Sequence, residues 1–442
     1  MKAKFKFHGR EEVLNIINTG GHLVEYLTST SEICPLIGSE IKLIKELGKG
    51  KYGTAYLVKI DGMGEKEYVA KVNNQKCSHE NIDIGDKPRA LLDIAESLED
   101  KYMIPSETFI SLNGENPRKM YTRGSHKFIF PGYAKMCLTS KITKYKRFDG
   151  MGDVVIPKGS YICSTEEYSE YVIGILCGEL YRKGVSINFL DVFGFASCPD
   201  ENKCLSKQYV FMEKAGMSLV QFAKKNKMDD TMIEVIFVQI LHAITVYQKY
   251  YKIQHNDLHL ENILIEHITP DTTYKKQKLI DADWFHYKIY DTDIYLPKIE
   301  VVIKIVDFGL SMKYSKPMVG NKRSLKSGQA ERKGWKPWIP NWYSESSDAV
   351  YMADDYYDTV PKNDFVRNIF GWMLGINKKQ LEKEINHERK RTFTSGGDRP
   401  DISMLSGKYY HSTPSNVLRN SKLMSKYLKI PKKGKIVTLG YI

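Results

Sequence analysis

The run His255-Asn256-Asp257-Leu258-His259-Leu260-Glu261-Asn262, followed by Ile263-Leu264-Ile265, decides the fold of this chain. A carboxylate at Asp257 and an amide at Asn262 stand in one polar loop, directly before an apolar strand. A carboxylate in such a loop can orient a hydroxyl group and accept its proton, and an amide oxygen can bind Mg²⁺. We therefore take Asp257 as the candidate base and Asn262 as a candidate metal ligand.

A second candidate metal ligand follows in Ile303-Lys304-Ile305-Val306-Asp307-Phe308-Gly309. Asp307 ends an apolar strand, Phe308 can pack and Gly309 allows a turn. An isolated Asp-Phe-Gly arises easily by chance. Its position after the His255–Asn262 loop gives it weight, and we expect Asp307 to supply the main carboxylate for Mg²⁺.

A glycine-rich loop, Gly48-Lys49-Gly50-Lys51-Tyr52-Gly53, precedes both. Alone this pattern also fits dinucleotide-binding folds, in which a helix follows at once. Here the strand-like Thr54–Val58 follows, which favours a hairpin over ATP phosphates. The expected nucleotide contacts are Leu47, Gly48, Lys49, Gly50, Lys51, Tyr52, Gly53, Thr54 and Ala55.

The segment Tyr68-Val69-Ala70-Lys71-Val72 places one lysine in an apolar strand downstream of the glycines. The ammonium group of Lys71 could reach the α- and β-phosphates of ATP, and a carboxylate would have to hold it there. We choose Glu170 as that carboxylate because it leads the apolar segment 171–177. Glu167 and Glu179 remain alternatives.

The pattern of apolar residues indicates an early sheet and a helix-rich second half, which is typical of α+β proteins. Strands are expected at 41–47, 54–60, 67–72 and 209–212, and helices at 168–181 and 232–252. The number of cysteines, seven, is odd, and no two of them form a Cys-x-x-Cys pair. We therefore expect free thiols in a reducing, cytoplasmic compartment. No apolar run approaches the length of a membrane span.

Glycine loop, lysine, His-x-Asp-x-x-x-x-Asn and Asp-Phe-Gly, in this order, resemble the protein-kinase superfamily from about Ile41 to about Leu374. The resemblance implies a bilobal α+β fold with a small antiparallel-sheet N-lobe and a mainly helical C-lobe. It implies an extension at 1–40, an N-lobe at 41–213 with an insertion at 74–165, a C-lobe at 214–405 and a basic tail at 406–442. It also implies ATP and Mg²⁺ as cofactors and Ser/Thr hydroxyls of proteins as acceptors.

Further roles come from the resemblance alone. The segment Tyr209–Gly216 is similar to the strand and hinge between kinase lobes, with Met212 as gatekeeper and the backbones of Glu213 and Ala215 on adenine. Asp364 would be the buried aspartate that anchors the catalytic loop.

Two residues depart from the ordinary kinase pattern. Asn256 replaces the catalytic-loop arginine, so we expect activity without activation-loop phosphorylation. His259 stands where a phosphate-binding lysine is usual, and Asp-Leu-His is similar to haspin-like kinases and to choline and aminoglycoside phosphotransferases. A small-molecule phosphotransferase and a pseudokinase scaffold therefore remain as alternatives. The insertions resemble those in kinases of large DNA viruses. This resemblance implies that the protein could be viral and associated with the virion.

The formal charge of +13 is concentrated near the C-terminus, where Lys408–Ile442 holds eight Lys or Arg and no Asp or Glu. We interpret this segment as a solvated tail, with an arm for an acidic partner as the alternative. We do not expect nucleic acid as the partner, because few aromatic residues are interleaved with the charges.

Overall fold

The computed structural model describes residues 34–49, 53–76, 166–199, 205–313, 347–374 and 413–442 almost continuously, with short strands between 102 and 164, at 318–321 and a few isolated positions. The chain divides into two compact units. Unit 1 comprises Met1–Ile175, Val192–Lys214 and Phe308–Trp342, and unit 2 comprises Leu176–Asp191, Ala215–Asp307 and Tyr343–Ile442. Each unit is described by itself.

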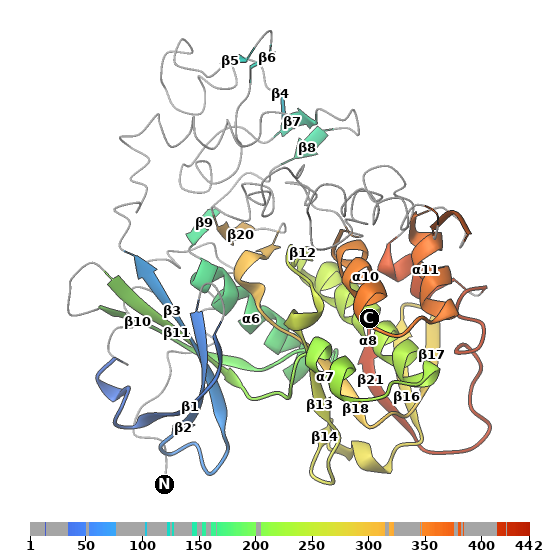
Figure 1. Ribbon diagram of the computed structural model, residues 1–442, viewed down its shortest axis with the longest axis horizontal. Helices are drawn as coiled ribbons and strands as arrows, with labels where there is room; N and C mark the ends of the chain where they lie inside the picture. The colour runs from blue at the N-terminus through green and yellow to red at the C-terminus, as the bar shows by residue number, and fades with distance from the viewer. Residues whose placement is uncertain are drawn as a thin grey trace. The chain divides into compact units, whose positions relative to one another are not determined.

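Unit 1 is built on a five-stranded antiparallel sheet in the order β1-β2-β3-β11-β10 (Figure 1). Its strands are β1 (Ile41–Lys49), β2 (Gly53–Ile60), β3 (Tyr68–Lys76), β10 (Val192–Pro199) and β11 (Leu205–Glu213). One face buries Val58, Ala70 and Phe211 completely, as period-two alternation along the strands predicts. The expected α+β class with a small antiparallel sheet is confirmed.

Helix α6 (Glu166–Arg182) begins in unit 1 and packs closely on this sheet. A Cβ atom on Gly174 would lie 2.8 Å from Val192 Cγ2, so glycine allows the helix to approach strand β10. Tyr171 stacks on Phe195 with ring centroids 5.2 Å apart. These contacts fix the helix face that carries Glu170.

Short strands complete the described part of unit 1. They are β4 (Tyr102–Met103), β5 (Thr122–Arg123), β6 (His126–Lys127), β7 (Lys144–Arg147), β8 (Asp153–Val155), β9 (Tyr161–Ser164), β19 (Met312–Lys313) and β20 (Met318–Asn321), with the 3₁₀ turn η6 (Phe308–Leu310). Most of the expected extension 1–40 and insertion 74–165 lies outside the described residues.

Unit 2 is organised around α8 (Asp230–Tyr251), which is buried along most of its length. The Asp229 side chain caps its first turn by accepting from Met232 N, and Lys252 ends it in the left-handed conformation. Helix α8 is long and apolar enough to cross a membrane, but 83% of its apolar window is buried inside the protein, as in a core helix. The other helices are α7 (Leu219–Lys225), α10 (Ser347–Thr359), α11 (Asp364–Leu374) and α14 (Pro414–Leu418).

Unit 2 also contains small sheets. Strand β13 (Ile263–His267) pairs with β18 (Val301–Ile305), and β16 (Trp284–Ile289) lies between β17 (Thr292–Pro297) and β21 (Ile436–Tyr441). The remaining elements are β12 (Ile253–Gln254), β14 (Thr273–Tyr274), β15 (Gln277–Lys278) and the 3₁₀ turns η4 (Leu260–Asn262) and η5 (Leu279–Asp281).

The expectation of a solvated C-terminal tail is wrong for residues 413–442. Strand β21 runs parallel to β16 and buries Val437 and Leu439 completely. Basic side chains of the segment contact the rest of the unit, as Arg419 pairs with Asp291 and Lys426 with Glu234. Alternation of buried residues in Ile436–Tyr441 indicates a strand, and an interpretation based on net charge overlooks it.

The expectation of free thiols is wrong for two cysteines. Cys34 and Cys198 form a disulfide with their Cα atoms 5.5 Å apart, although 164 residues separate them in sequence. Both lie in the hydrophobic cluster on one face of the unit 1 sheet, where β10 carries Cys198 to the turn before β1. Cys177 is free and buried. Cys77, Cys137 and Cys204 lie outside the described residues.

Candidate functional site

The glycine loop connects β1 to β2, whose register pairs Lys49 with Thr54 and Gly48 with Ala55. A Cβ atom at Gly48 would meet no atom within 4 Å, so packing among the described residues does not require glycine there. Leu47 is half-exposed on β1. Gly50, Lys51 and Tyr52, at the tip of the hairpin, lie outside the described residues.

Lys71 and Glu170 meet in unit 1. The distance from Lys71 Nζ to Glu170 Oε2 is 2.8 Å, with side-chain exposures of 21% and 4%. Strand β3 holds Lys71 next to the fully buried Ala70, and the packing of α6 on the sheet brings in Glu170. The ion pair expected from the sequence is present.

Of the two alternatives to Glu170 as the partner of Lys71, Glu179 pairs with another lysine. Glu179 Oε2 lies 3.6 Å from Lys183 Nζ on the same helix, as an i,i+4 pair. The side chain of Glu167 lies outside the described residues.

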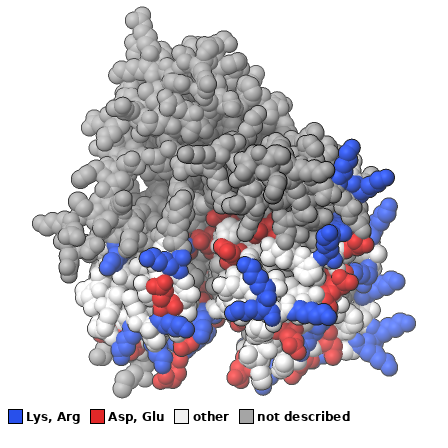
Figure 2. Space-filling view, in the orientation of Figure 1, with Lys and Arg blue, Asp and Glu red and all other residues white. Residues whose placement is uncertain are grey.

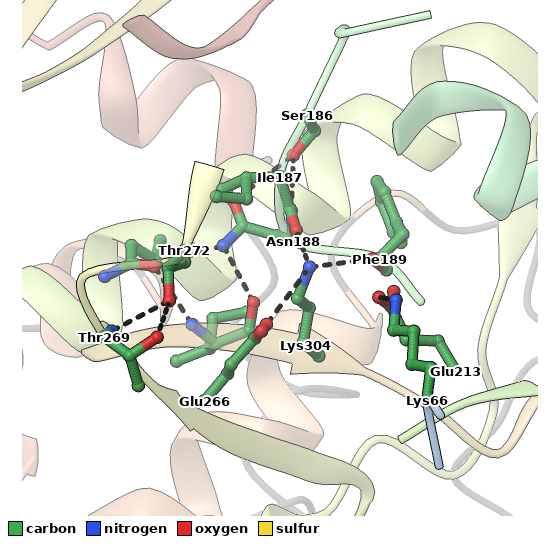
Figure 3. A network of polar contacts seen from close by, with 12 residues as sticks. Lys66, Ser186, Ile187, Asn188, Phe189, Glu213, Glu266, Thr269, Thr272 and Lys304 are labelled. Atoms are coloured by element: carbon green, nitrogen blue, oxygen red, sulfur yellow. Dashed lines mark hydrogen bonds and ion pairs between the residues drawn. The ribbon is translucent and has the colours of Figure 1, made fainter. Parts of the chain in front are cut away.

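Strand β11 ends at the expected hinge. Met212 is buried and pairs with Val69, while Glu213 pairs with Tyr68. Two ion pairs fix this end of the strand to the β2–β3 connection: Lys66 Nζ to Glu213 Oε1 at 3.0 Å, drawn in Figure 3, and Lys214 Nζ to Glu67 Oε2 at 2.7 Å. The hydrogen bond from Lys214 is the main cause that lowers the pKa of Glu67.

Ala215 begins unit 2. At the next residue, Gly216, there is no room for a side chain, which sequence analysis did not recognise. A Cβ atom at Gly216 would lie 2.0 Å from the carbonyl oxygen of Ile265 on β13. Only glycine permits this approach. The segment that follows Ala215 is thereby packed against β13, the strand that follows the His255–Asn262 loop.

Within that loop, Asn262 connects the candidate catalytic residues. Its Nδ2 donates to the Asp257 carbonyl oxygen at 2.9 Å and lies 3.2 Å from His259 Nε2. His259 Nε2 lies 3.8 Å from Asp257 Oδ2. Because the amide nitrogen of Asn262 makes both contacts, its Oδ1 atom is the group that remains to bind a cation.

The pairing of β13 with β18 brings Asn262 next to the segment of Asp307. Ile263 is opposite Ile305, and Val306 N donates to the Asn262 carbonyl oxygen at 3.0 Å. His255 Nε2 lies 2.9 Å from the Val306 carbonyl oxygen, so this ring also joins the loop to the segment of Asp307. The two candidate metal ligands therefore stand at the same end of one strand pair.

Asn256 and Asp307 both have positive φ angles, 66° and 65°. Such backbone strain in residues other than glycine concentrates at functional sites, where the surrounding structure enforces it. Asn256 directly precedes the candidate base Asp257, and Asp307 is itself a candidate metal ligand.

A buried carboxylate fixes the start of the loop, but it is not Asp364. Asp348 at the start of α10 accepts from His255 N and Tyr247 OH, both at 2.8 Å, and from Asn256 N at 3.0 Å. Burial raises the pKa of Asp348 to about 6, although these hydrogen bonds oppose the shift. The expectation for Asp364 is wrong, because its side chain is 72% exposed at the start of α11 and contacts Arg367.

A second buried charge holds strand β18 in place. Figure 3 shows Lys304, which is 2% exposed and whose Nζ donates to the carbonyl oxygens of Ile187 at 2.8 Å and Phe189 at 3.2 Å. Glu266 on β13 balances its charge at 3.4 Å. These contacts and the β13–β18 ladder fix the strand that ends just before Asp307.

The structure thus groups the expected site residues into two sets. Unit 1 holds the glycine hairpin, Lys71 and Glu170, and unit 2 holds Asp257, Asn262 and Asp307. No group of three or more His, Cys, Asp or Glu suited to hold a metal occurs among the described residues. No protein-family model matches the chain, and no curated protein is significantly similar to it in sequence.

Proposed function

We propose that this chain is an ATP-dependent protein kinase with a bilobal kinase-like fold, which transfers the γ-phosphate of Mg-ATP to Ser or Thr hydroxyls of proteins. The observation that carries the proposal is the connected set in unit 2. Asn262 is hydrogen-bonded to the Asp257 carbonyl oxygen and, through its own carbonyl oxygen, to the residue before Asp307. Protein kinases use a base and two oxygen ligands for metal that are held close together, the arrangement that these contacts would support.

In this proposal Asp257 orients the acceptor hydroxyl and takes its proton. Its side chain is 21% exposed, so a substrate can reach it, and the hydrogen bond from Asn262 fixes its backbone. Asn262 Oδ1 and the Asp307 carboxylate would hold Mg²⁺, which neutralises phosphate charge when bound. Two protein ligands suffice, since Mg²⁺ is usually bound by one or two side chains together with phosphate oxygens and water.

Lys71 positions the α- and β-phosphates, and Glu170 keeps its ammonium group in place. The residues fit this role because a lysine 21% exposed, held by a carboxylate 4% exposed, presents one positive charge in a fixed position. In this proposal the nucleotide phosphates lie beside the hairpin at Gly48, where an added Cβ atom would meet no described atom within 4 Å. The backbone groups of Glu213, at the end of β11, and of Ala215, in the proposed hinge, would bind adenine.

The acceptor class is tested with purified protein, Mg-ATP labelled at the γ-phosphate and a mixed panel of basic proteins, acidic proteins and small alcohols. Label on Ser and Thr of proteins is the expected result. Label only on small alcohols would replace the proposal by a choline- or aminoglycoside-type phosphotransferase. ATP binding without any transfer would instead indicate a scaffold.

A further inference from the structure

The segment Lys422–Lys435, between α14 and β21, is a surface loop held at both ends by unit 2. Met424 and Tyr427 are buried, and the Tyr427 carbonyl oxygen accepts from Tyr295 N at 2.7 Å. At the other end Lys435 N donates to Asp283 Oδ2 at 2.7 Å. Because both ends are fixed, the residues between Tyr427 and Lys435 are presented outward at a fixed place.

This segment carries unbalanced positive charge. Arg419–Lys435 contains seven Lys or Arg and no Asp or Glu. Three of the seven form ion pairs with carboxylates elsewhere in the unit, namely Arg419, Lys426 and Lys435. The other four, Lys422, Lys429, Lys432 and Lys433, are exposed and have no ion-pair partner among the described residues. Figure 2 shows Lys and Arg side chains along the edge where this segment runs in Figure 1.

An apolar side chain stands among these lysines. Ile430 is 70% exposed, the highest exposure among the large hydrophobic residues that the structure describes, and Pro431 follows it. Ile436, just beyond the segment, is 36% exposed. The half-buried indole of Trp284 donates through Nε1 to the Lys433 carbonyl oxygen at 3.2 Å. An exposed isoleucine flanked by unpaired lysines offers both an apolar and a cationic contact.

We propose that the Lys422–Lys435 segment docks on the surface of an anionic lipid bilayer, with Ile430 entering the headgroup region and the four unpaired lysines facing the lipid charges. Lysine-rich surfaces with an apolar tip suit this partner. Protein–protein interfaces are depleted of lysine and favour Tyr, Trp and Arg. Single-stranded nucleic acid is bound by stacking on exposed aromatic rings, whereas the apex here is an aliphatic side chain.

The test uses the full chain and sedimentation with vesicles of phosphatidylcholine, with or without about 30% phosphatidylserine. Binding is expected only to the phosphatidylserine vesicles, and it should weaken as salt is raised. Changing Lys429, Lys432 and Lys433 together to Gln should lower the partition coefficient about 100-fold, roughly fivefold per lysine. Ile430→Ser leaves the charge unchanged and should lower it by about tenfold.

The matched control changes Lys224, Lys225 and Lys227 to Gln, which removes the same charge from exposed positions in and just after α7. This variant should bind the vesicles as the wild type does. Equal loss in both triple variants, equal binding to neutral vesicles, no binding to either kind of vesicle, or no effect of Ile430→Ser would overturn the proposal. Binding to polyglutamate or to a single-stranded oligonucleotide but not to vesicles would overturn it in favour of that partner.

Discussion

The backbone N–H groups of His255 and Asn256 depend on a single buried carboxylate, that of Asp348. Asp348→Asn can accept through only one side-chain oxygen and should leave one of the two N–H groups without a good partner. A buried unpaired donor costs about 1–3 kcal/mol. We expect a loss of that size in the free energy of unfolding, and a fall in kcat because Asp257 follows directly, measured by denaturant unfolding and by turnover.

Asp364→Asn is the matched control for this prediction. Asp364 is exposed and forms an ion pair with Arg367 in the same helix turn. Because the Asp364 carboxylate is 72% exposed and lies 3.8 Å from Arg367 Nη1, this pair should contribute at most about 1 kcal/mol. If Asp364→Asn were the more damaging substitution, the anchoring role of Asp348 would be wrong.

Sequence analysis assigned the anchoring role to Asp364 from the resemblance alone and did not weigh Asp348. Each of these aspartates stands in the first turn of a helix. The residue buried at the start of α11 is instead Asn363, which donates to Asp230 Oδ1 at 2.9 Å. Asp348 follows a polar stretch without periodicity, and its partners lie 92 and 93 residues away. Such pairing depends on tertiary packing, which local pattern does not contain.

The ion pair of Lys71 with Glu170 permits a prediction with a control in the same helix. Glu170→Gln removes the charge that holds the ammonium group, so kcat/KM for ATP should fall by about tenfold or more, as for a lost contact of about 1.4 kcal/mol. Glu179→Gln changes a carboxylate of the same helix that pairs with Lys183 instead of Lys71, and it should leave kcat/KM for ATP nearly unchanged. Equal effects of both substitutions would argue against the assignment of Glu170.

His242 makes stability depend on pH. It is fully buried in α8 against the Tyr287 ring and Gly440, and neither ring nitrogen has a hydrogen-bond partner among the residues that the structure describes. Burial, with a smaller contribution from His286, lowers the pKa of His242 to about 3. In the unfolded chain the imidazole of His242 takes up a proton at its ordinary pKa of 6.5, whereas in the folded state it stays neutral. The folded state therefore loses stability as pH falls below about 6.5.

The loss assigned to His242 should reach about 3 kcal/mol at pH 4, at about 1.4 kcal/mol per pH unit. Unfolding in denaturant between pH 7 and pH 4 measures it. His242→Leu cannot take up the proton, so its stability should vary less over this range. Parallel pH curves for the two proteins would show that His242 is not the cause.

At the scale of elements, the C-terminal strand β21 is the main feature that the sequence analysis missed, because the segment was interpreted from its net charge. Leu439 on β21 is fully buried, and its carbonyl oxygen accepts from Ile187 N at 2.9 Å. Leu439→Ala should lower the free energy of unfolding by about 2–5 kcal/mol, the usual cost of a cavity in a core. Ile430→Ala, at an exposed position of the same segment, should change it by less than about 0.5 kcal/mol. Thermal or denaturant unfolding compares them, and similar small losses would mean that the segment is a tail.

The disulfide links the turn before β1 to β10 across the unit 1 sheet. A crosslink between distant residues restricts the unfolded chain, so reduction should destabilise the protein by about 2–4 kcal/mol. Thermal unfolding with and without reductant measures this, and Cys34→Ser should remove the difference. Peptide mapping that finds Cys34 and Cys198 unlinked under oxidising conditions would refute the pairing.

Elements with strong periodicity were predictable from sequence, and long-range pairings were not. The helix expected at 232–252 is α8 at Asp230–Tyr251, and the strand expected at 54–60 is β2 at Gly53–Ile60. The spacing of apolar residues predicted the type and extent of both elements, although α8 is buried on all sides from Ile233 to Gln248 rather than on one face. The parallel pairing of β21 with β16 joins segments about 150 residues apart, as Trp284 with Ile436, and neither sequence specifies the other.

At the scale of the whole molecule, the proposed chemistry requires both units. The lysine with its carboxylate partner belongs to unit 1, and the base with the candidate metal ligands belongs to unit 2. The order of the motifs along the chain was the evidence in the sequence that they serve one reaction. Each set has internal support from buried contacts, at Glu170 in one and at Asp348 and Lys304 in the other.

The most direct test of phosphoryl transfer is the rate at which purified wild type and Asp257→Asn move label from γ-labelled Mg-ATP to protein Ser and Thr. Asp271→Asn, at an exposed position outside the loop, is the matched control. Removal of the base should lower the rate by about 10²–10⁴-fold without loss of folded structure, while the control keeps wild-type turnover. Equal turnover of Asp257→Asn and wild type, or no transfer by wild type that binds ATP, would contradict the account.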